Sequence, residues 1–161
     1  MNVMPSSKAR ARYAKHGVPT KFDEIKRKVK GLNLPTGKYA LFGSVPMSAH
    51  GIRESNDIDL IVMPELFARL EATGEWEETF PNGRKKLAKG DFEVYNGWWS
   101  SDSYRRDVSK LIAGAEILDG VPVVKLEEVL VWKKAFGREK DLKDVKLIEE
   151  FLSRQKLREY T

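Results

Sequence analysis

The residues with the clearest capacity for chemistry are two aspartates separated by one aliphatic residue. Asp57 and Asp59 flank Ile58 in an apolar run that extends to Val62 and predicts a β-strand. Side chains two residues apart on a strand project from the same face, so the two carboxylates would lie side by side. Such carboxylates repel each other unless a cation lies between them, and Mg²⁺ takes oxygen ligands, often together with substrate phosphates. The spacing therefore predicts a metal site at Asp57 and Asp59.

A short glycine-containing segment upstream predicts a phosphate-binding loop. Gly43 and Ser44 follow the apolar residues 39–42, and a glycine at the end of a strand allows close approach of the backbone. Pro46 suits the first turn of a short helix that stops at Gly51. Backbone N–H groups at a helix start attract phosphate, and a serine hydroxyl would lie beside them. We expect this loop and the predicted metal site to lie at adjacent strand ends.

The two segments together resemble a known signature. The nucleotidyltransferase superfamily to which DNA polymerase β belongs has an apolar residue, then Gly and Gly or Ser, a spacer, and Asp-apolar-Asp-apolar. The matching residues here are Phe42-Gly43-Ser44 and Asp57-Ile58-Asp59-Leu60. The run His50-Gly51-Ile52-Arg53 is similar, more narrowly, to AbiEii-type toxins and lincosamide-type nucleotidyltransferases. The resemblance implies an α+β fold in which a mixed β-sheet is flanked by helices, like the palm of polymerase β.

A second match lies near the C-terminus. Lys133 is followed by Arg138-Glu139-Lys140-Asp141 and then by Asp144, which matches the Lys … Arg-x-Lys-Asp-x-x-Asp pattern of AbiEii-like proteins. In those proteins the helical lysines help to hold the nucleotide and the acidic residues brace them. Without the resemblance, the same residues indicate a charged helix pair with weak salt bridges. The nucleotide-binding residues that the resemblance implies are Gly43, Ser44, Arg53, Lys133 and Lys140. His50 is expected to be a structural part of its loop.

A third carboxylate is expected on a later strand. In the superfamily this acidic residue lies between two apolar residues, and Glu93 fits that position better than Asp91, which follows Gly90. The resemblance implies that Asp57, Asp59 and Glu93 are the catalytic residues and ligate Mg²⁺, in a two-metal site that Mn²⁺ could also fill.

The implied function is Mg²⁺-dependent transfer of a nucleoside monophosphate from an NTP to a hydroxyl acceptor, with release of pyrophosphate. Two acceptor classes remain open, namely RNA, especially a tRNA end, and a small hydroxylated molecule such as an antibiotic. The alternative is a weak or inactive member of the fold that acts as a regulator or nucleic-acid-binding module in a toxin–antitoxin system. An antitoxin or another protein would then be its partner.

Composition limits the chemistry further. The 161 residues include no cysteine, which excludes a disulfide framework, a thiol nucleophile and a Cys-based zinc site. The net charge is +5 and its excess precedes residue 39, so we expect a flexible basic arm at residues 1–18. Residues 19–161 are expected to form one domain that ends in a helical pair. The basic segment either steers a nucleic acid or is a solvated surface. Without an apolar signal core or membrane span, a cytoplasmic protein with no membrane partner is expected.

Hydrophobic periodicity and turn residues predict the elements that position these groups. Helices are expected at residues 20–31, 46–50, 64–71, 104–112, 126–136 and 139–152. Strands are expected at residues 39–42, 57–62, 84–89, 91–95, 115–118 and 121–124. Pro122 should restrict the last of these to a sheet edge. Trp98 and Trp99 follow a glycine, and each is expected either to stack on a base or to pack against the core.

Overall fold

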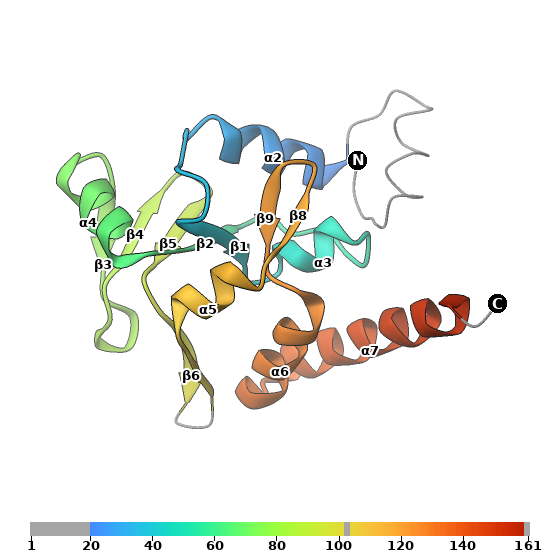
Figure 1. Ribbon diagram of the computed structural model, residues 1–161. Coiled ribbons are helices and arrows are strands. Elements are labelled where there is room, and N and C mark those ends of the chain that lie inside the picture. Colours follow the sequence, from blue (N-terminus) through green and yellow to red (C-terminus); the bar gives the residue numbers. More distant parts are fainter. Residues whose placement is uncertain (1–19, 102–103, 160–161) are drawn as a thin grey trace.

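The computed structural model describes residues 20–101 and 104–159, which form an open mixed sheet with helices on both faces (Figure 1). The strands are β1 (Tyr39–Phe42), β2 (Ile58–Val62), β3 (Glu77–Thr79), β4 (Lys86–Lys89), β5 (Phe92–Tyr95), β6 (Trp98–Ser101), β7 (Tyr104–Arg106), β8 (Glu116–Leu118) and β9 (Val121–Val123). The helices are α2 (Lys21–Lys30), α3 (Val45–Ala49), α4 (Pro64–Ala72), the 3₁₀ turn η1 (Pro81–Gly83), α5 (Val108–Ala113), α6 (Leu126–Phe136) and α7 (Glu139–Glu159). The sheet order among described residues is β3-β4-β5-β2-β1-β9-β8, and β6 pairs with β7 in a separate hairpin.

The expected α+β class with a mixed sheet flanked by helices is confirmed. In the sheet, β2 pairs antiparallel with β1 and parallel with β5. The nucleotidyltransferase fold in particular stays a prediction. The predicted arm at residues 1–18 lies outside the described residues.

Successive side chains of the central strands point to opposite faces of the sheet and belong to two hydrophobic cores. Tyr39 and Leu41 of β1 belong to the cluster formed with α2 and α4, whereas Ala40 and Phe42 belong to the cluster formed with α5, α6 and α7. Each strand therefore contributes apolar side chains to both faces, as expected for a sheet covered on both sides. Asp59 alternates with Ile58 and Leu60, which face α2 and α4. Its side chain consequently projects toward the layer of α5, α6 and α7.

Local signals set the ends of several helices. Thr20 and Asp23 form a capping box at the start of α2, with hydrogen bonds of 2.8 and 3.0 Å between each side chain and the other residue's backbone N–H. Gly137 ends α6 with a left-handed φ of 68°. These features satisfy backbone groups that a helix end leaves unpaired, and they explain why the sequence predicted both boundaries.

The helix predicted at residues 104–112 was wrong in its first half. Tyr104–Arg106 is the strand β7, paired antiparallel with β6, which the sequence did not predict. The helix α5 starts only at Val108, where Asp107 is the N-cap and its carboxylate accepts a hydrogen bond from the Ser109 N–H at 2.9 Å. The apolar spacing correctly predicted a helix from Val108 onward. The residues before Asp107 pair with β6 and therefore form a strand in spite of their helical spacing.

The prediction that Pro122 lies in an edge strand was also wrong. β9 lies between β1 and β8, and β8 is the edge. Pairing of β9 with β1 is short: Leu41 is opposite Val123, and the Val124 N–H donates to the Leu41 carbonyl at 2.9 Å. Because that ladder begins after Pro122, the missing N–H of the proline interrupts no central hydrogen bond.

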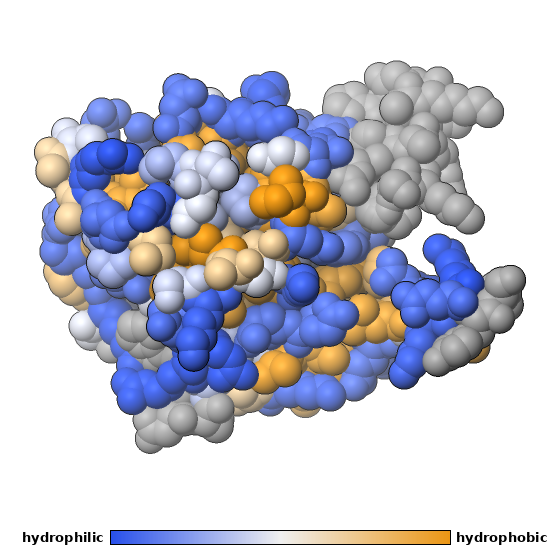
Figure 2. Space-filling view, in the orientation of Figure 1, coloured by the Kyte–Doolittle hydropathy of each residue, from blue (hydrophilic) through white to orange (hydrophobic). Residues whose placement is uncertain are grey.

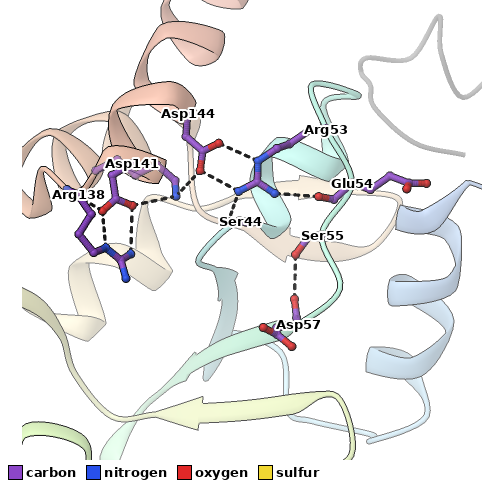
Figure 3. A network of polar contacts seen from close by, with 9 residues as sticks. Ser44, Arg53, Glu54, Ser55, Asp57, Arg138, Asp141 and Asp144 are labelled. Atoms are coloured by element: carbon purple, nitrogen blue, oxygen red, sulfur yellow. Dashed lines mark hydrogen bonds and ion pairs between the residues drawn. The ribbon is translucent and has the colours of Figure 1, made fainter.

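Buried ion pairs attach α6 and α7 to the loop after β1 (Figure 3). The Lys133 amine of α6 lies 2.8 Å from Asp144 Oδ2 and 3.6 Å from Asp141 Oδ1, both on α7. Asp141 also accepts hydrogen bonds from Arg138 Nε at 2.6 Å and Nη2 at 3.1 Å. Lys133 is 3% exposed and Asp141 0%, so each buried charge depends on its partners.

The second aspartate extends the network to the loop. Asp144 accepts hydrogen bonds from Arg53 Nε and Nη2, both at 2.8 Å, and Arg53 Nη2 also donates to Ser44 Oγ at 2.9 Å. Burial raises the pKa of Asp144, but hydrogen bonds from Arg53 and Lys133 outweigh it and hold that pKa below its ordinary value. The helical pair and the Gly43 loop are thus linked through ionised groups.

The substitution Asp141→Asn tests how much this buried network of ion pairs contributes to stability. It removes a buried charge that Lys133 and Arg138 require, so we expect the free energy of unfolding to fall by about 3 kcal/mol, or Tm by about 10 °C for a chain of this size. The matched control is Glu149→Gln, which breaks the exposed pair with Lys134 on the same two helices and should change Tm little. Equal melting temperatures for the two variants in thermal denaturation would contradict this account.

Candidate active site

Strand register brings two of the three predicted carboxylates together. β2 and β5 are parallel neighbours, and Asp59 lies opposite Glu93. Asp57 comes directly before β2, where its backbone carbonyl accepts a hydrogen bond from the Ser55 hydroxyl at 2.9 Å (Figure 3). All three carboxylate residues line the same cavity.

The electrostatics of Asp59 reflect this crowding. Burial raises its pKa from the ordinary 3.8, the negative charges of Glu93 and Asp57 raise it further, and Lys86 offsets part of the shift, which leaves the pKa at about 7. Without a bound cation, Asp59 is therefore protonated in a large fraction of molecules at neutral pH.

Two donors hold the carboxylate of Glu93. The Tyr95 hydroxyl donates to Glu93 Oε1 at 2.9 Å, and the Lys86 amine lies 3.3 Å from Oε2. Asp91, the alternative third carboxylate, is exposed and pairs instead with Lys28 at 2.6 Å. The structure therefore places Glu93 at the cavity and Asp91 at a surface ion pair.

The Gly43 loop lies directly against Asp59. Gly43 has φ +65°, and a Cβ atom added to it would lie 2.1 Å from Asp59 Oδ2. Only glycine leaves room for this carboxylate and adopts the left-handed backbone without strain. Ser44 precedes α3, but its hydroxyl accepts the Arg53 hydrogen bond and does not cap that helix.

The cavity combines negative, aromatic and positive walls. Its volume is about 340 Å³, within the range of small-molecule sites. The aromatic side chains on it are Tyr95, Trp98, Trp132 and Phe136. The cationic side chains on it are Arg84, Lys85, Arg138 and Lys140. Carboxylates and cations that line one cavity are suited to a ligand with phosphates and a bound metal ion.

The aromatic wall is largely occupied by its own packing. Trp98 stacks on Phe42 with ring centroids 4.6 Å apart and meets Trp132 edge-on at 5.1 Å. Phe136 is the more accessible ring, at 38% exposed, and the Arg138 guanidinium lies 3.8 Å from its centroid. Phe136 is consequently more accessible than Trp98, and the Arg138 guanidinium covers one face of its ring. The side chain of Trp99 lies outside the described residues.

The predicted nucleotide-binding residues divide into two groups. Lys140 lines the cavity, is exposed, and makes no ion pair within the described part of the chain. The other four, Gly43, Ser44, Arg53 and Lys133, are absent from the described lining residues. Arg53 and Lys133 are instead committed to Asp144. Their contact with a nucleotide stays a prediction.

His50 has a structural environment, as expected. Its Nε2 lies 2.7 Å from Glu116 Oε1, and its ring packs edge-on against Phe151 at 5.6 Å. The residue therefore connects the end of α3 to β8 and α7.

Sequence reasoning missed several cavity residues. Tyr95 has a local signal, because it follows Glu93 by two residues on the same strand face. Trp132 and Phe136 are four residues apart on α6, which places them on one helix side. Arg138 belongs to the C-terminal motif of the sequence analysis, although it was not named there as a site residue. Arg84 has no comparable signal, since only tertiary packing brings its segment to the carboxylates.

The donor set fits a cation that arrives with its substrate. Among residues 20–101 and 104–159, no group of three or more His, Asp or Glu side chains converges closely enough to hold a metal ion. Asp57, Asp59 and Glu93 nevertheless share one cavity, and a cation there would relieve the repulsion between them. Mg²⁺ in nucleotide sites is usually held by one or two carboxylates plus phosphates, which matches this arrangement.

Comparison with family models, with curated proteins and with solved structures gives no match to this chain. The resemblance to nucleotidyltransferases therefore rests on the sequence motifs alone.

No helix in the described part of the chain has the length and apolar character needed to cross a bilayer.

The substitution Gly43→Ala should disrupt the contact with Asp59. We expect a lower Tm and loss of ligand binding at the cavity, because the added methyl overlaps the carboxylate. Gly90→Ala is the matched control, since Gly90 has φ +59° with no atom within 4 Å of the added Cβ. It reports the cost of the left-handed backbone alone, about 1 kcal/mol. An equal loss of Tm in both variants would show that the predicted overlap is relieved without cost.

Asp59→Asn should change how stability depends on pH. The folded protein binds the Asp59 proton with a pKa near 7, against 3.8 for an ordinary aspartate, so the wild type loses stability as pH rises through this window. In EDTA, the variant should be about 2–4 kcal/mol more stable than the wild type at pH 8 and similar to it at pH 4.

The control for this titration is Asp91→Asn. A hydrogen bond from Lys28 lowers the pKa of Asp91, so Asp91 contributes stability above the ordinary pKa and its loss should lower stability at pH 8. Urea denaturation at several pH values measures both. A destabilised Asp59→Asn protein at pH 8 would refute the sign argued for Asp59.

Proposed function

We propose that this chain is a Mg²⁺-dependent nucleotidyltransferase that transfers a nucleoside monophosphate from an NTP to a hydroxyl acceptor. The observation that carries the proposal is the placement of Asp59 opposite Glu93 and against the Gly43 backbone, at a cavity that also holds Asp57 and Lys140. The resemblance of Phe42-Gly43-Ser44 and Asp57-Ile58-Asp59-Leu60 to the superfamily signature supports the same assignment.

Asp57, Asp59 and Glu93 would hold the metal, for which Mn²⁺ is an expected substitute. When bound, Mg²⁺ supplies Lewis-acid stabilisation of negative charge on the phosphates. Lys140 lines the cavity, makes no ion pair with the other described residues, and could bind the phosphates. Arg138 is held by Asp141 and adds a second positive charge at the cavity.

The base has a place on the aromatic wall. Phe136 is exposed at the cavity, and Trp132 lies beside it with ring centroids 6.2 Å apart. A planar base that covers Phe136 would bury apolar surface of the ring and gain stacking energy. In this proposal the base would lie at α6, and the phosphates would lie near Lys140 of α7 and the strand carboxylates.

The transfer step uses Glu93 as the proton acceptor. The acceptor hydroxyl oxygen forms a bond to the α-phosphorus, the bond from that phosphorus to the bridging oxygen breaks, and pyrophosphate leaves. The hydroxyl proton passes to Glu93, whose carboxylate is oriented by Tyr95 and Lys86. Ser44 and Arg53 support the loop that carries Gly43.

A regulator of the same fold without turnover is the second candidate. It is favoured by the lack, in the described residues, of a converged group of three potential metal ligands. Such a protein would transfer no nucleotide, and failure to bind Mg²⁺–NTP would support it as well.

Transfer of label from each α-³²P-NTP in the presence of Mg²⁺ distinguishes the two. RNA and a small hydroxylated molecule are supplied as separate acceptors. We expect labelled acceptor with the wild type, a loss of more than about 10²-fold in Asp59→Asn, and little change in Asp91→Asn. Glu93→Gln should lower kcat, because the proton acceptor is lost, and should also weaken binding of Mg²⁺–NTP, because Glu93 helps to hold the metal.

Equal transfer by the wild type and Asp59→Asn would overturn the proposal. NTP binding without transfer to any acceptor would assign the chain to the second candidate.

A further inference from the structure

We infer that the acceptor is an RNA strand that docks along α7, with its end at the cavity. This inference rests on the proposed function, because it chooses between the acceptor classes for the same site. The feature that carries it is a row of exposed cations on α7, here called the α7 stripe. It consists of Lys140, Lys143, Lys146 and Arg154.

The α7 stripe lies on one side of the helix. At about 100° per residue, its four members fall within an arc of about 120°. The buried residues of α7 lie on the other side and include Asp141, Ile148 and Phe151. At a rise of about 1.5 Å per residue, the stripe extends about 21 Å from Lys140 to Arg154. It therefore presents charge along a line, as a phosphate backbone requires.

The cations of the α7 stripe are available to a ligand. Within the described residues, none of its four members lies within 4 Å of a carboxylate oxygen in an ion pair. The cations of α2 differ in part: Lys21 pairs with Glu24, Lys26 with Asp23 and Asp119, and Lys28 with Asp91, whereas Arg27 and Lys30 are exposed without an ion pair within the described residues. Phosphates would contact α7 without first breaking protein ion pairs, which makes α7 a better nucleic-acid surface than α2.

The position of α7 suits a long ligand. Lys140 lines the cavity, and the C-terminal half of the helix projects beyond the rest of the described structure (Figure 1). Hydrophilic side chains cover most of that projecting end in the space-filling view (Figure 2). A strand placed on the stripe leads its terminal hydroxyl toward Asp59 and Glu93, whereas a small acceptor would use none of this surface.

Other exposed side chains share this side of α7, among them the carboxylates Glu139 and Glu150 and the apolar Leu147 and Leu157. Leu147 lies within the stripe at 38% exposed and offers apolar contact to a base. Glu150 is an exposed carboxylate on the same side and opposes phosphate binding. Its replacement by a cation is therefore a direct test of the direction of the charge effect.

The experiment compares two triple variants that lose the same charge. The first, Lys143→Gln/Lys146→Gln/Arg154→Gln, removes the stripe but keeps Lys140. The control, Arg69→Gln/Lys110→Gln/Lys125→Gln, removes three exposed cations on α4, on α5 and directly before α6. Binding of a fluorescent single-stranded RNA oligonucleotide is measured between about 50 and 200 mM salt, after thermal melts show that both variants are folded.

We expect the stripe variant to bind RNA at least tenfold more weakly at low salt. The slope of log K against log salt should fall by about 2, since each lost phosphate contact of a single strand contributes about 0.7. Glu150→Lys should bind RNA more tightly than the wild type. Binding of Mg²⁺–NTP should be unchanged in all three variants, because none of their substitutions lies at the cavity.

Equal RNA affinity of the stripe variant and the wild type, or an equal loss in the control, would overturn the inference. Label transfer to a small acceptor but not to RNA would overturn it as well, while the proposed nucleotidyltransferase activity stands. RNA binding through the stripe without transfer by the wild type would support the docking surface and count against the proposed activity. The two claims are therefore tested separately.

Discussion

Asp59 and Glu93 lie opposite each other on neighbouring parallel strands, where burial and like charge both disfavour the ionised form of Asp59. The surroundings offset only part of this cost: Lys86 lies beside Glu93, Tyr95 donates a hydrogen bond to it, and Gly43 leaves space for the second carboxylate. Apolar residues at these two strand positions would make a more stable sheet. Retained repulsion of this kind is typical of a functional site and favours a cationic ligand.

The positive charges of the C-terminal helices are divided by location. Lys133 and Arg53 both form ion pairs with Asp144, where α6 and α7 contact the loop after β1. Lys140 and its neighbours along the outer side of α7 are exposed and, among the described residues, unpaired. The internal ion pairs fix the orientation of α7 relative to the strand carboxylates. As a result, the exposed cations of the α7 stripe face the solvent and are accessible to a phosphate ligand. One helix thus has a structural side and a side free to bind.

Local patterns predicted the parts of this structure that depend on local physics. The period of two along a strand predicted Asp57 and Asp59 side by side, the resemblance selected Glu93, and all three line one cavity. The capping residue Thr20 marked the start of α2. Tyr104–Arg106 was misassigned because a three-residue strand depends on its partner β6. The aromatic wall was missed in part because the position of Phe136 follows from how α6 packs on the sheet. The sequence also could not predict which cations form ion pairs, because pairs such as that of Lys133 with Asp144 depend on tertiary contacts.

The most direct test is a crystal structure of the wild-type chain with Mn²⁺ and a non-hydrolysable NTP analogue, with data collected at the manganese absorption edge. The account predicts an anomalous peak between the carboxylates of Asp57 and Asp59, with the phosphates facing Lys140 and the base at Phe136. Asp59→Asn crystals treated in the same way should lack the peak. A nucleotide bound elsewhere, or at this cavity with no metal at either aspartate, would contradict the central claim.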